Sequence, residues 1–146
     1  MNACEADALS MTAIAENKGF EVSTLRTESA AREQVKNEIQ AAAEDLRSGD
    51  IFMLSYSGHG GQLPDMNSDE PDALDETWCL YDGEMIDDEV YGLLGNFAEG
   101  VRVLVFSDSC HSGTVTKVAY YSGTVNTRGE TQIGRASCRE RVCLYV

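Results

Sequence analysis

One stretch of the sequence decides the fold, namely IFMLSYSGHGG at residues 51–61. Its first seven residues are mostly apolar, as expected of a strand that is covered on both faces of a sheet. A histidine flanked by glycines follows at 58–61. The pattern returns in VRVLVFSDSCHSG at residues 101–113, with a cysteine in place of the histidine. We therefore expect two buried strands, each ending in a turn of small residues that carries one reactive side chain.

The remaining local signals alternate between helix and strand. We expect helices at Glu5–Lys18 and Thr27–Arg47 and a short helix at Asp87–Phe97. Between them we expect a strand at Phe20–Leu25 and a long loop at 58–83. Such alternation predicts an α/β fold with a mostly parallel sheet and helices on both faces. In these sheets ligands bind at the C-terminal ends of strands, where both small-residue motifs lie.

Charge and cysteine usage exclude several classes of function. The formal net charge is −14, and residues 65–89 hold eleven acids and no Lys or Arg. Nucleic acids and anionic membranes need a basic surface, so we expect neither as a partner. The acidic run instead favours a hard cation or a basic substrate. The five cysteines show no CxxC spacing, which predicts reduced thiols. No signal peptide or membrane span is visible, so we expect the protein in the cytoplasm.

The two motifs together indicate nucleophilic catalysis. Neighbouring strands lie about 5 Å apart, so His59 and Cys110 are expected within reach of each other. An imidazole raises the thiolate fraction of a nearby cysteine, and the thiolate is the nucleophile. Backbone N–H groups of Gly60 and Cys110 are candidates for an oxyanion hole. His111 is the alternative base, although its side chain should diverge from the adjacent thiol. Taken singly, Cys110 could be a small buried side chain and His59 a loop residue.

These motifs also resemble a known family. Ser-Gly-His-Gly-Gly at 57–61 and Asp-Ser-Cys-His-Ser-Gly at 108–113 resemble the histidine and cysteine motifs of metacaspases and bacterial caspase-like peptidases of the C14 type. His59 and Cys110 lie 51 positions apart (110 − 59), close to the spacing in caspases. The resemblance covers about Asn2–Thr116. It implies a three-layer caspase-like fold, a Cys110–His59 dyad and peptide-bond hydrolysis through a thioester.

The resemblance also implies roles for several acids. Caspases have Gln-Ala before the cysteine, whereas this chain has Asp108 and Ser109. In metacaspases the matching acid lines the S1 pocket, which implies that Asp108 selects Arg or Lys at P1. Asp87 and Asp88, with Asp75 as a less certain third ligand, resemble a calcium site. The alternative is that Asp87 and Asp88 only serve a helix N-terminus. The chemistry itself requires no cofactor.

The expected domain organisation is incomplete. We expect residues 1–132 to form part of a caspase-like catalytic domain, resembling the large subunit. Residues 133–146 resemble a translated sequencing adapter, so we expect them to be a non-native tail. The resembling family has a strand before the first helix and further strands after the cysteine, so this fragment could be inactive by itself. The expected partners are protein or peptide substrates, and the oligomeric state is open. The alternatives are a non-catalytic binding or scaffold domain and a calcium-binding module.

Overall fold

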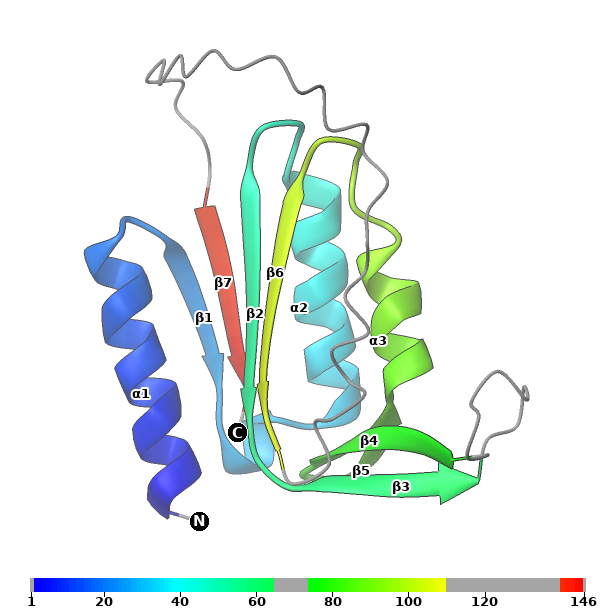
Figure 1. The fold of residues 1–146 in the computed structure, drawn as a ribbon. Helices are drawn as coiled ribbons and strands as arrows, with labels where there is room; N and C mark the ends of the chain where they lie inside the picture. The colour runs from blue at the N-terminus through cyan, green and yellow to red at the C-terminus, as the bar shows by residue number, and fades with distance from the viewer. Residues whose placement is uncertain (1, 65–73, 110–139, 146) are drawn as a thin grey trace, which may run out of the picture.

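The computed structural model describes residues 2–64, 74–109 and 140–145, which form two sheets. The larger sheet is parallel and has, in spatial order, the strands β1 (Glu21–Leu25), β7 (Glu140–Tyr145), β2 (Ile51–Ser57) and β6 (Arg102–Asp108). The smaller sheet is antiparallel, with the strands β3 (Gly60–Pro64), β4 (Leu74–Leu80) and β5 (Gly83–Ile86). It lies beside the C-terminal ends of β2 and β6 (Figure 1).

Helices cover both faces of the parallel sheet. Helix α1 (Asn2–Asn17) lies on one face, and α2 (Arg32–Asp45) and α3 (Asp87–Leu94) lie on the other (Figure 1). Gly19 follows α1 with φ of 89°, a left-handed conformation that glycine adopts at helix C-termini. The result is the three-layer α/β arrangement that the sequence predicted.

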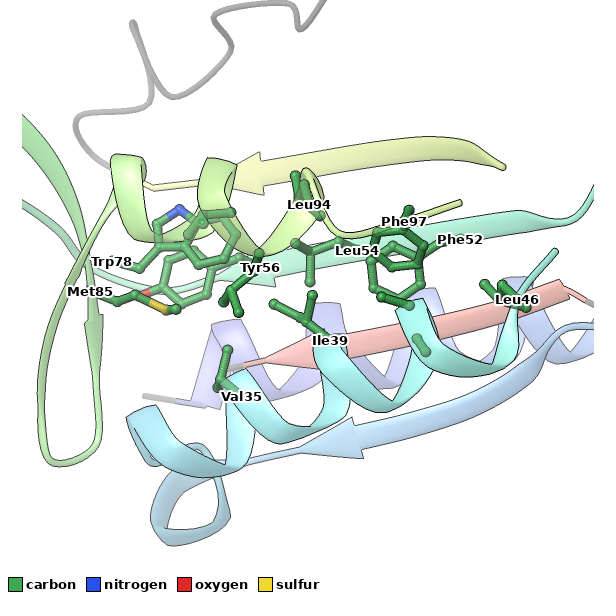
Figure 2. Close-up of a cluster of buried hydrophobic side chains, with 14 of the residues drawn as sticks. Val35, Ile39, Leu46, Phe52, Leu54, Tyr56, Trp78, Met85, Leu94 and Phe97 are labelled. Atoms are coloured by element: carbon green, nitrogen blue, oxygen red, sulfur yellow. The ribbon is translucent and has the colours of Figure 1, made fainter. Parts of the chain in front are cut away.

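The main core lies between β2, α2 and α3 (Figure 2). Helix α2 buries Val35, Ile39, Ala42 and Ala43, which share one helical face. Alternate residues of β2 point toward this layer, because side chains alternate across a strand, and they are Phe52, Leu54 and Tyr56. On the opposite face, Met53 packs with Ala15 of α1. Strand β2 is therefore covered on both faces, as its apolar run predicted.

The long loop expected at 58–83 is wrong for the described part of that segment. Strands β3 and β4 fill much of it, and residues 65–73 lie outside the described residues. The reason is visible in β4, where Trp78 and Leu80 enter the core while Thr77 contacts Glu84 on β5. The buried residues Asp75, Glu76 and Thr77 of the same strand are polar, so no apolar alternation marks it in the sequence.

Several helix boundaries also differ from expectation. The first helix begins at Asn2, three residues before the expected Glu5. The second helix begins at Arg32, because Thr27–Ser29 form a separate 3-10 turn. The third helix ends at Leu94, three residues before the expected Phe97. Helix ends are set by local hydrogen bonds that a hydrophobic pattern specifies poorly.

The backbone of β7 pairs in parallel with both β1 and β2. It lies within the segment 133–146, which the sequence predicted to be a non-native tail. That assignment, and the boundary of the catalytic domain at 132, stay predictions.

Candidate active site

The ends of β2 and β6 form the candidate active site. The two strands pair in parallel from Ile51 with Arg102 to Ser57 with Asp108. The Gly58 N–H extends this contact by donating to the Asp108 carbonyl oxygen at 3.1 Å. The two strands that precede the motifs are therefore neighbours and end at the same edge of the sheet. Cys110 lies one residue beyond the described segment 74–109, so its distance from His59 stays a prediction.

The backbone of His59 is held from two sides while its side chain is exposed. Its carbonyl oxygen accepts the Cys79 N–H at 2.9 Å and the Tyr56 hydroxyl at 2.7 Å. Gly58 makes this possible, because a Cβ at that position would lie 2.6 Å from the Cζ of Tyr56. The Tyr56 ring thus occupies the space that any other residue at 58 would need, and it fixes the turn that presents the imidazole.

The glycines after His59 begin β3. Gly60 lies opposite Trp78 and Gly61 opposite Thr77 on β4. A Cβ on Gly61 would meet the Thr77 hydroxyl at 2.8 Å, so β4 packs tightly against this part of the turn. The oxyanion-hole role expected for the N–H groups of Gly60 and Cys110 stays a prediction.

A pocket of about 580 Å³ opens between α1 and the ends of β2 and β6. Asp108 lines it, and its role in substrate binding stays a prediction. Asp7 lines the same pocket from α1, and its carboxylate accepts the Ser57 hydroxyl at 3.3 Å. Two carboxylates from distant parts of the chain therefore face one cavity. Sequence reasoning missed Asp7, because no local pattern relates residues 7 and 57.

The expected calcium residues lie beside the small sheet. Asp75, on β4, and Asp87, at the start of α3, are 4% and 5% exposed, and Glu76 is similarly buried. Burial raises the pKa of Asp87 to about 6, and the negative charges of Asp88, Glu76 and Asp75 add to this effect. A hydrogen bond from the Asp88 N–H partly offsets it by lowering the pKa. The Oε2 atom of Glu76 is buried without a hydrogen-bond partner among the described residues. These acids are therefore close enough to repel one another.

A preformed metal centre is nevertheless absent from this part of the chain. Within residues 2–64, 74–109 and 140–145, no group of three or more His, Cys, Asp or Glu side chains could hold a metal ion as arranged. The residues thus fit a cation in charge and burial, but their side chains do not form a ligand set.

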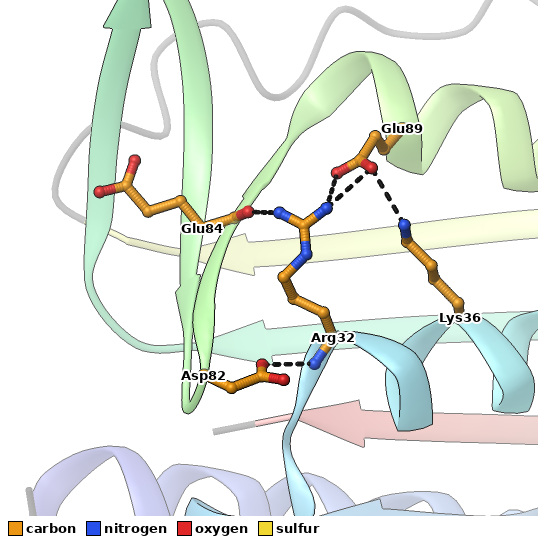
Figure 3. A network of polar contacts seen from close by, with 5 residues as sticks. All are labelled: Arg32, Lys36, Asp82, Glu84 and Glu89. Carbon is orange, nitrogen blue, oxygen red and sulfur yellow. Dashed lines mark hydrogen bonds and ion pairs between the residues drawn. The ribbon is translucent and has the colours of Figure 1, made fainter.

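Arg32 ties the acidic region to α2 (Figure 3). Its backbone N–H donates to Asp82, and its guanidinium donates to the Glu84 carbonyl oxygen and, through one nitrogen, to both oxygens of Glu89 at 2.9 Å. Lys36 donates to the same Glu89 carboxylate at 3.0 Å. The start of α2 is thereby fixed to the β4–β5 turn and to the first turn of α3, which also carries Asp87.

A parallel α/β sheet with a glycine-flanked histidine and an Asp-Ser-Cys sequence at adjacent strand ends defines the class of caspase-like peptidases. The chain belongs to the metacaspase family, since residues 1–119 match the model of the metacaspase, peptidase C14 domain. No helix in the described part of the chain is both long enough and apolar enough to cross a membrane.

Several known proteins are similar to the chain. Metacaspase-1 of Saccharomyces cerevisiae is 38% identical over 96 residues, which cover 62% of this chain and 22% of the yeast protein. Metacaspase-1B of Aspergillus fumigatus is 32% identical over 107 residues, covering 70% of this chain and 26% of that protein. The crystal structure of protein GSU0716 from Geobacter sulfurreducens matches with a TM-score of 0.69 and 69% identity, over 81% of this chain and 45% of that one. The chain thus spans about a quarter of these curated relatives.

Proposed function

We propose that the protein is a cysteine endopeptidase in which Cys110 is the nucleophile and His59 moves the proton. The family supports cysteine-type peptidase chemistry. The observation that carries the assignment to these residues is the parallel pairing of β2 with β6, which ends with Ser57 opposite Asp108. His59 lies two residues past the first strand end and Cys110 two residues past the second.

The proposed reaction has two steps. The Cys110 thiolate attacks the carbonyl carbon of the scissile peptide, and the C–N bond breaks as the His59 imidazolium gives its proton to the leaving amine. Water then loses a proton to His59 and attacks the thioester, which releases the carboxylic acid product and regenerates the thiol. N–H groups of Gly60 and Cys110 stabilise the oxyanion in both steps. The fixed His59 peptide and exposed imidazole suit a group that must reach both substrate and thiol.

The proposed substrate has Arg or Lys at P1. The support is the pocket between α1 and the strand ends, because Asp108 and Asp7 both line it. A guanidinium can satisfy carboxylates with several donors at once, which favours Arg over a neutral side chain by a few kcal/mol at most. An acidic P1 side chain would be repelled by both carboxylates.

The specificity test compares fluorogenic peptides that end in Arg, Lys or Asp. We expect the Arg and Lys peptides to be cleaved faster than the Asp peptide. Asp108→Asn and Asp7→Asn should each raise KM for the Arg peptide more than they lower kcat. Faster cleavage of the Asp peptide would contradict the proposed specificity. Absence of turnover, with no selective labelling of Cys110, would instead favour a non-catalytic scaffold.

We also propose that calcium binds at Asp87 and Asp88, with Asp75 as a further ligand. The support is the buried like charge around Asp87 and the orphaned Oε2 atom of Glu76, which a cation would compensate. The side chains would have to rearrange to form the site, since they do not form a ligand set in the described structure. Bound calcium would neutralise these acids, and it takes no part in the proposed bond-breaking steps.

Calorimetry tests the calcium proposal without any measurement of activity. Calcium should give a binding heat that disappears in the Asp87→Ala, Asp88→Ala double variant. Glu99→Gln, which changes an exposed acid outside this region, should bind as the wild type does. Equal heats in wild type and double variant would discard the site.

A further inference from the structure

We propose that Tyr56 and Trp78 act as a positioning pair, whose two polar groups fix the ends of β2 and β6 and thereby set the distance between His59 and Cys110. This inference rests on the proposed Cys110–His59 dyad. It adds two buried residues, together with the polar contacts through which they act.

The two aromatic rings form one buried unit. Tyr56 comes from β2 and Trp78 from β4, and each is 1% exposed. Their ring centroids are 4.7 Å apart and their planes are 14° from parallel, so the rings are stacked. Figure 2 shows them side by side at one end of the core, next to Met85. A stacked pair of this size moves little, because both neighbouring sheets hold it in place.

The polar atom of Tyr56 points at the histidine turn. Its hydroxyl lies 2.7 Å from the His59 carbonyl oxygen and 3.2 Å from that of Cys79. Because the Cys79 N–H donates to the same His59 carbonyl, the His59 peptide is joined to β2 and β4 together. Burial, with smaller contributions from Cys79 and Cys4, raises the pKa of Tyr56, so the hydroxyl remains a donor throughout the working pH range.

The polar atom of Trp78 points at the other motif. Its indole N–H donates to the Ser107 hydroxyl at 3.1 Å. The Ser107 hydroxyl lies 3.4 Å from that of Ser109, the residue directly before Cys110. One stacked pair therefore reaches the His59 peptide through a phenol and the approach to Cys110 through an indole.

Packing alone does not explain this choice of residues. At the far end of β2, Phe52 and Phe97 form a comparable contact, with centroids 4.6 Å apart and no polar atoms in the rings. Phenylalanine at 56 would fill nearly the same space, and phenylalanine at 78 would keep an aromatic ring in a smaller volume. Apolar packing therefore requires neither polar group, whereas buried Tyr and Trp need hydrogen-bond partners. Here both partners belong to the two motifs, which points to alignment of the strand ends.

The test uses Tyr56→Phe and Trp78→Phe, which keep an aromatic ring at each position and remove one polar group each. Each protein is assayed with a fluorogenic peptide that ends in Arg. Each variant should lower kcat on the order of ten-fold while KM changes less than about two-fold, because small misplacement of reacting groups costs rate more than binding. The pH dependence of Cys110 alkylation by iodoacetamide should shift in both variants.

Phe97→Leu is the matched control, since it loosens the other aromatic pair. It should lower the thermal midpoint at least as much as either test variant and leave kcat unchanged. Wild-type kcat and alkylation profile in Tyr56→Phe and Trp78→Phe would overturn the positioning role. So would a fall of kcat in Phe97→Leu that matches its loss of stability.

If Trp78→Phe fails to fold, Ser107→Ala removes the indole's acceptor with a smaller change in volume. It should reproduce the fall in kcat, and unchanged kcat would overturn the proposal. Cys110→Ala separates this inference from the proposed function. Activity that survives Cys110→Ala refutes the dyad, whereas activity that needs Cys110 but ignores Tyr56 and Trp78 refutes only the positioning pair.

Discussion

At the scale of single residues, the site combines groups that a sequence pattern can reveal with groups that it cannot. His59 and Asp108 follow apolar strands in the sequence, so their shared edge was predictable. Asp7 was not, because its contact with Ser57 joins residues fifty positions apart through the packing of α1 on β2. Tyr56 carries a hint in hindsight, since a tyrosine two residues before an obligatory glycine fills the space of the missing side chain.

The raised pKa of Asp87 predicts how the stability of the fold depends on pH. Its pKa is about 6 in the folded protein, above the usual 3.8, so the folded state holds this proton more tightly than the unfolded state. Its contribution therefore favours folding at low pH and is lost as pH rises through about 6. Asp87→Asn should raise the free energy of unfolding at pH 8 by up to about 3 kcal/mol and change it little near pH 4.

Urea unfolding at the two pH values, without calcium, measures this difference. Asparagine keeps an oxygen that can accept the Asp88 N–H, so this hydrogen bond at the start of α3 is preserved. Glu99→Gln serves as the control at an exposed acid and should have no comparable effect at either pH. A destabilised Asp87→Asn at pH 8 would show that the ionised carboxylate is compensated rather than costly.

At the scale of elements, hydrophobic patterning predicted α1, α2, β2 and β6. Helix α2 buries one apolar face and β2 is covered on both faces, as expected. Strand β6 was expected to be buried as well, and that is wrong, because its outward-facing Leu104 and Phe106 are 46% and 49% exposed. Hydrophobic patterning missed the small sheet. Strands β3 and β4 pair antiparallel at the end of the molecule, and their residues include Gly, Gln, Pro, Asp and Glu. Only tertiary packing of Trp78 and Leu80 and pairing with neighbouring strands make such segments extended, and neither is visible locally.

Arg32 supports a prediction about how these elements are joined. Arg32→Lys keeps the charge, but an ammonium cannot reach the Glu84 carbonyl and both Glu89 oxygens together. We expect a loss of about 1–2 kcal/mol, since the ion pair is partly exposed and one backbone carbonyl loses its donor. Chemical denaturation measures the loss, and hydrogen exchange should rise at 80–89.

Lys36→Met is the control for this experiment, because it removes the second donor to Glu89 from the same helix. Its effect should be smaller and should leave exchange at the β4–β5 turn unchanged. An Arg32→Lys protein as stable as the wild type would mean that Arg32 contributes charge alone.

At the scale of the whole molecule, the notable feature is the strand between β1 and β2. Sequence order predicted a parallel sheet with helices on both faces, but not which strands are neighbours. The backbone of 140–145 fills the gap and pairs with both sides. Strand neighbours depend on the path of the chain between them, which local patterns do not encode.

Truncation of the chain tests directly what this strand contributes to stability. A version that ends at Gln132 loses β7, which leaves facing N–H and C=O groups of β1 and β2 unpaired. We expect a clearly lower thermal midpoint than for residues 1–146. Sequencing of the locus past Gln132 then tests the non-native tail. A continuous reading frame through Val146 would end that assignment. If the genomic sequence differs from this chain after Gln132, the protein it encodes should keep a high thermal midpoint although it lacks residues 133–146.

The proposed peptidase function depends most on the Cys110–His59 pair. Alkylation of Cys110 by iodoacetamide, followed against pH by mass spectrometry, tests it most directly, with Cys79 in the same molecule as an internal reference. Burial, then the Glu84 carboxylate, raises the pKa of Cys79, so it should react only at high pH. We predict that Cys110 reacts at much lower pH in the wild type and that His59→Ala moves its profile toward that of an ordinary thiol. Identical Cys110 profiles in the two proteins would contradict the dyad.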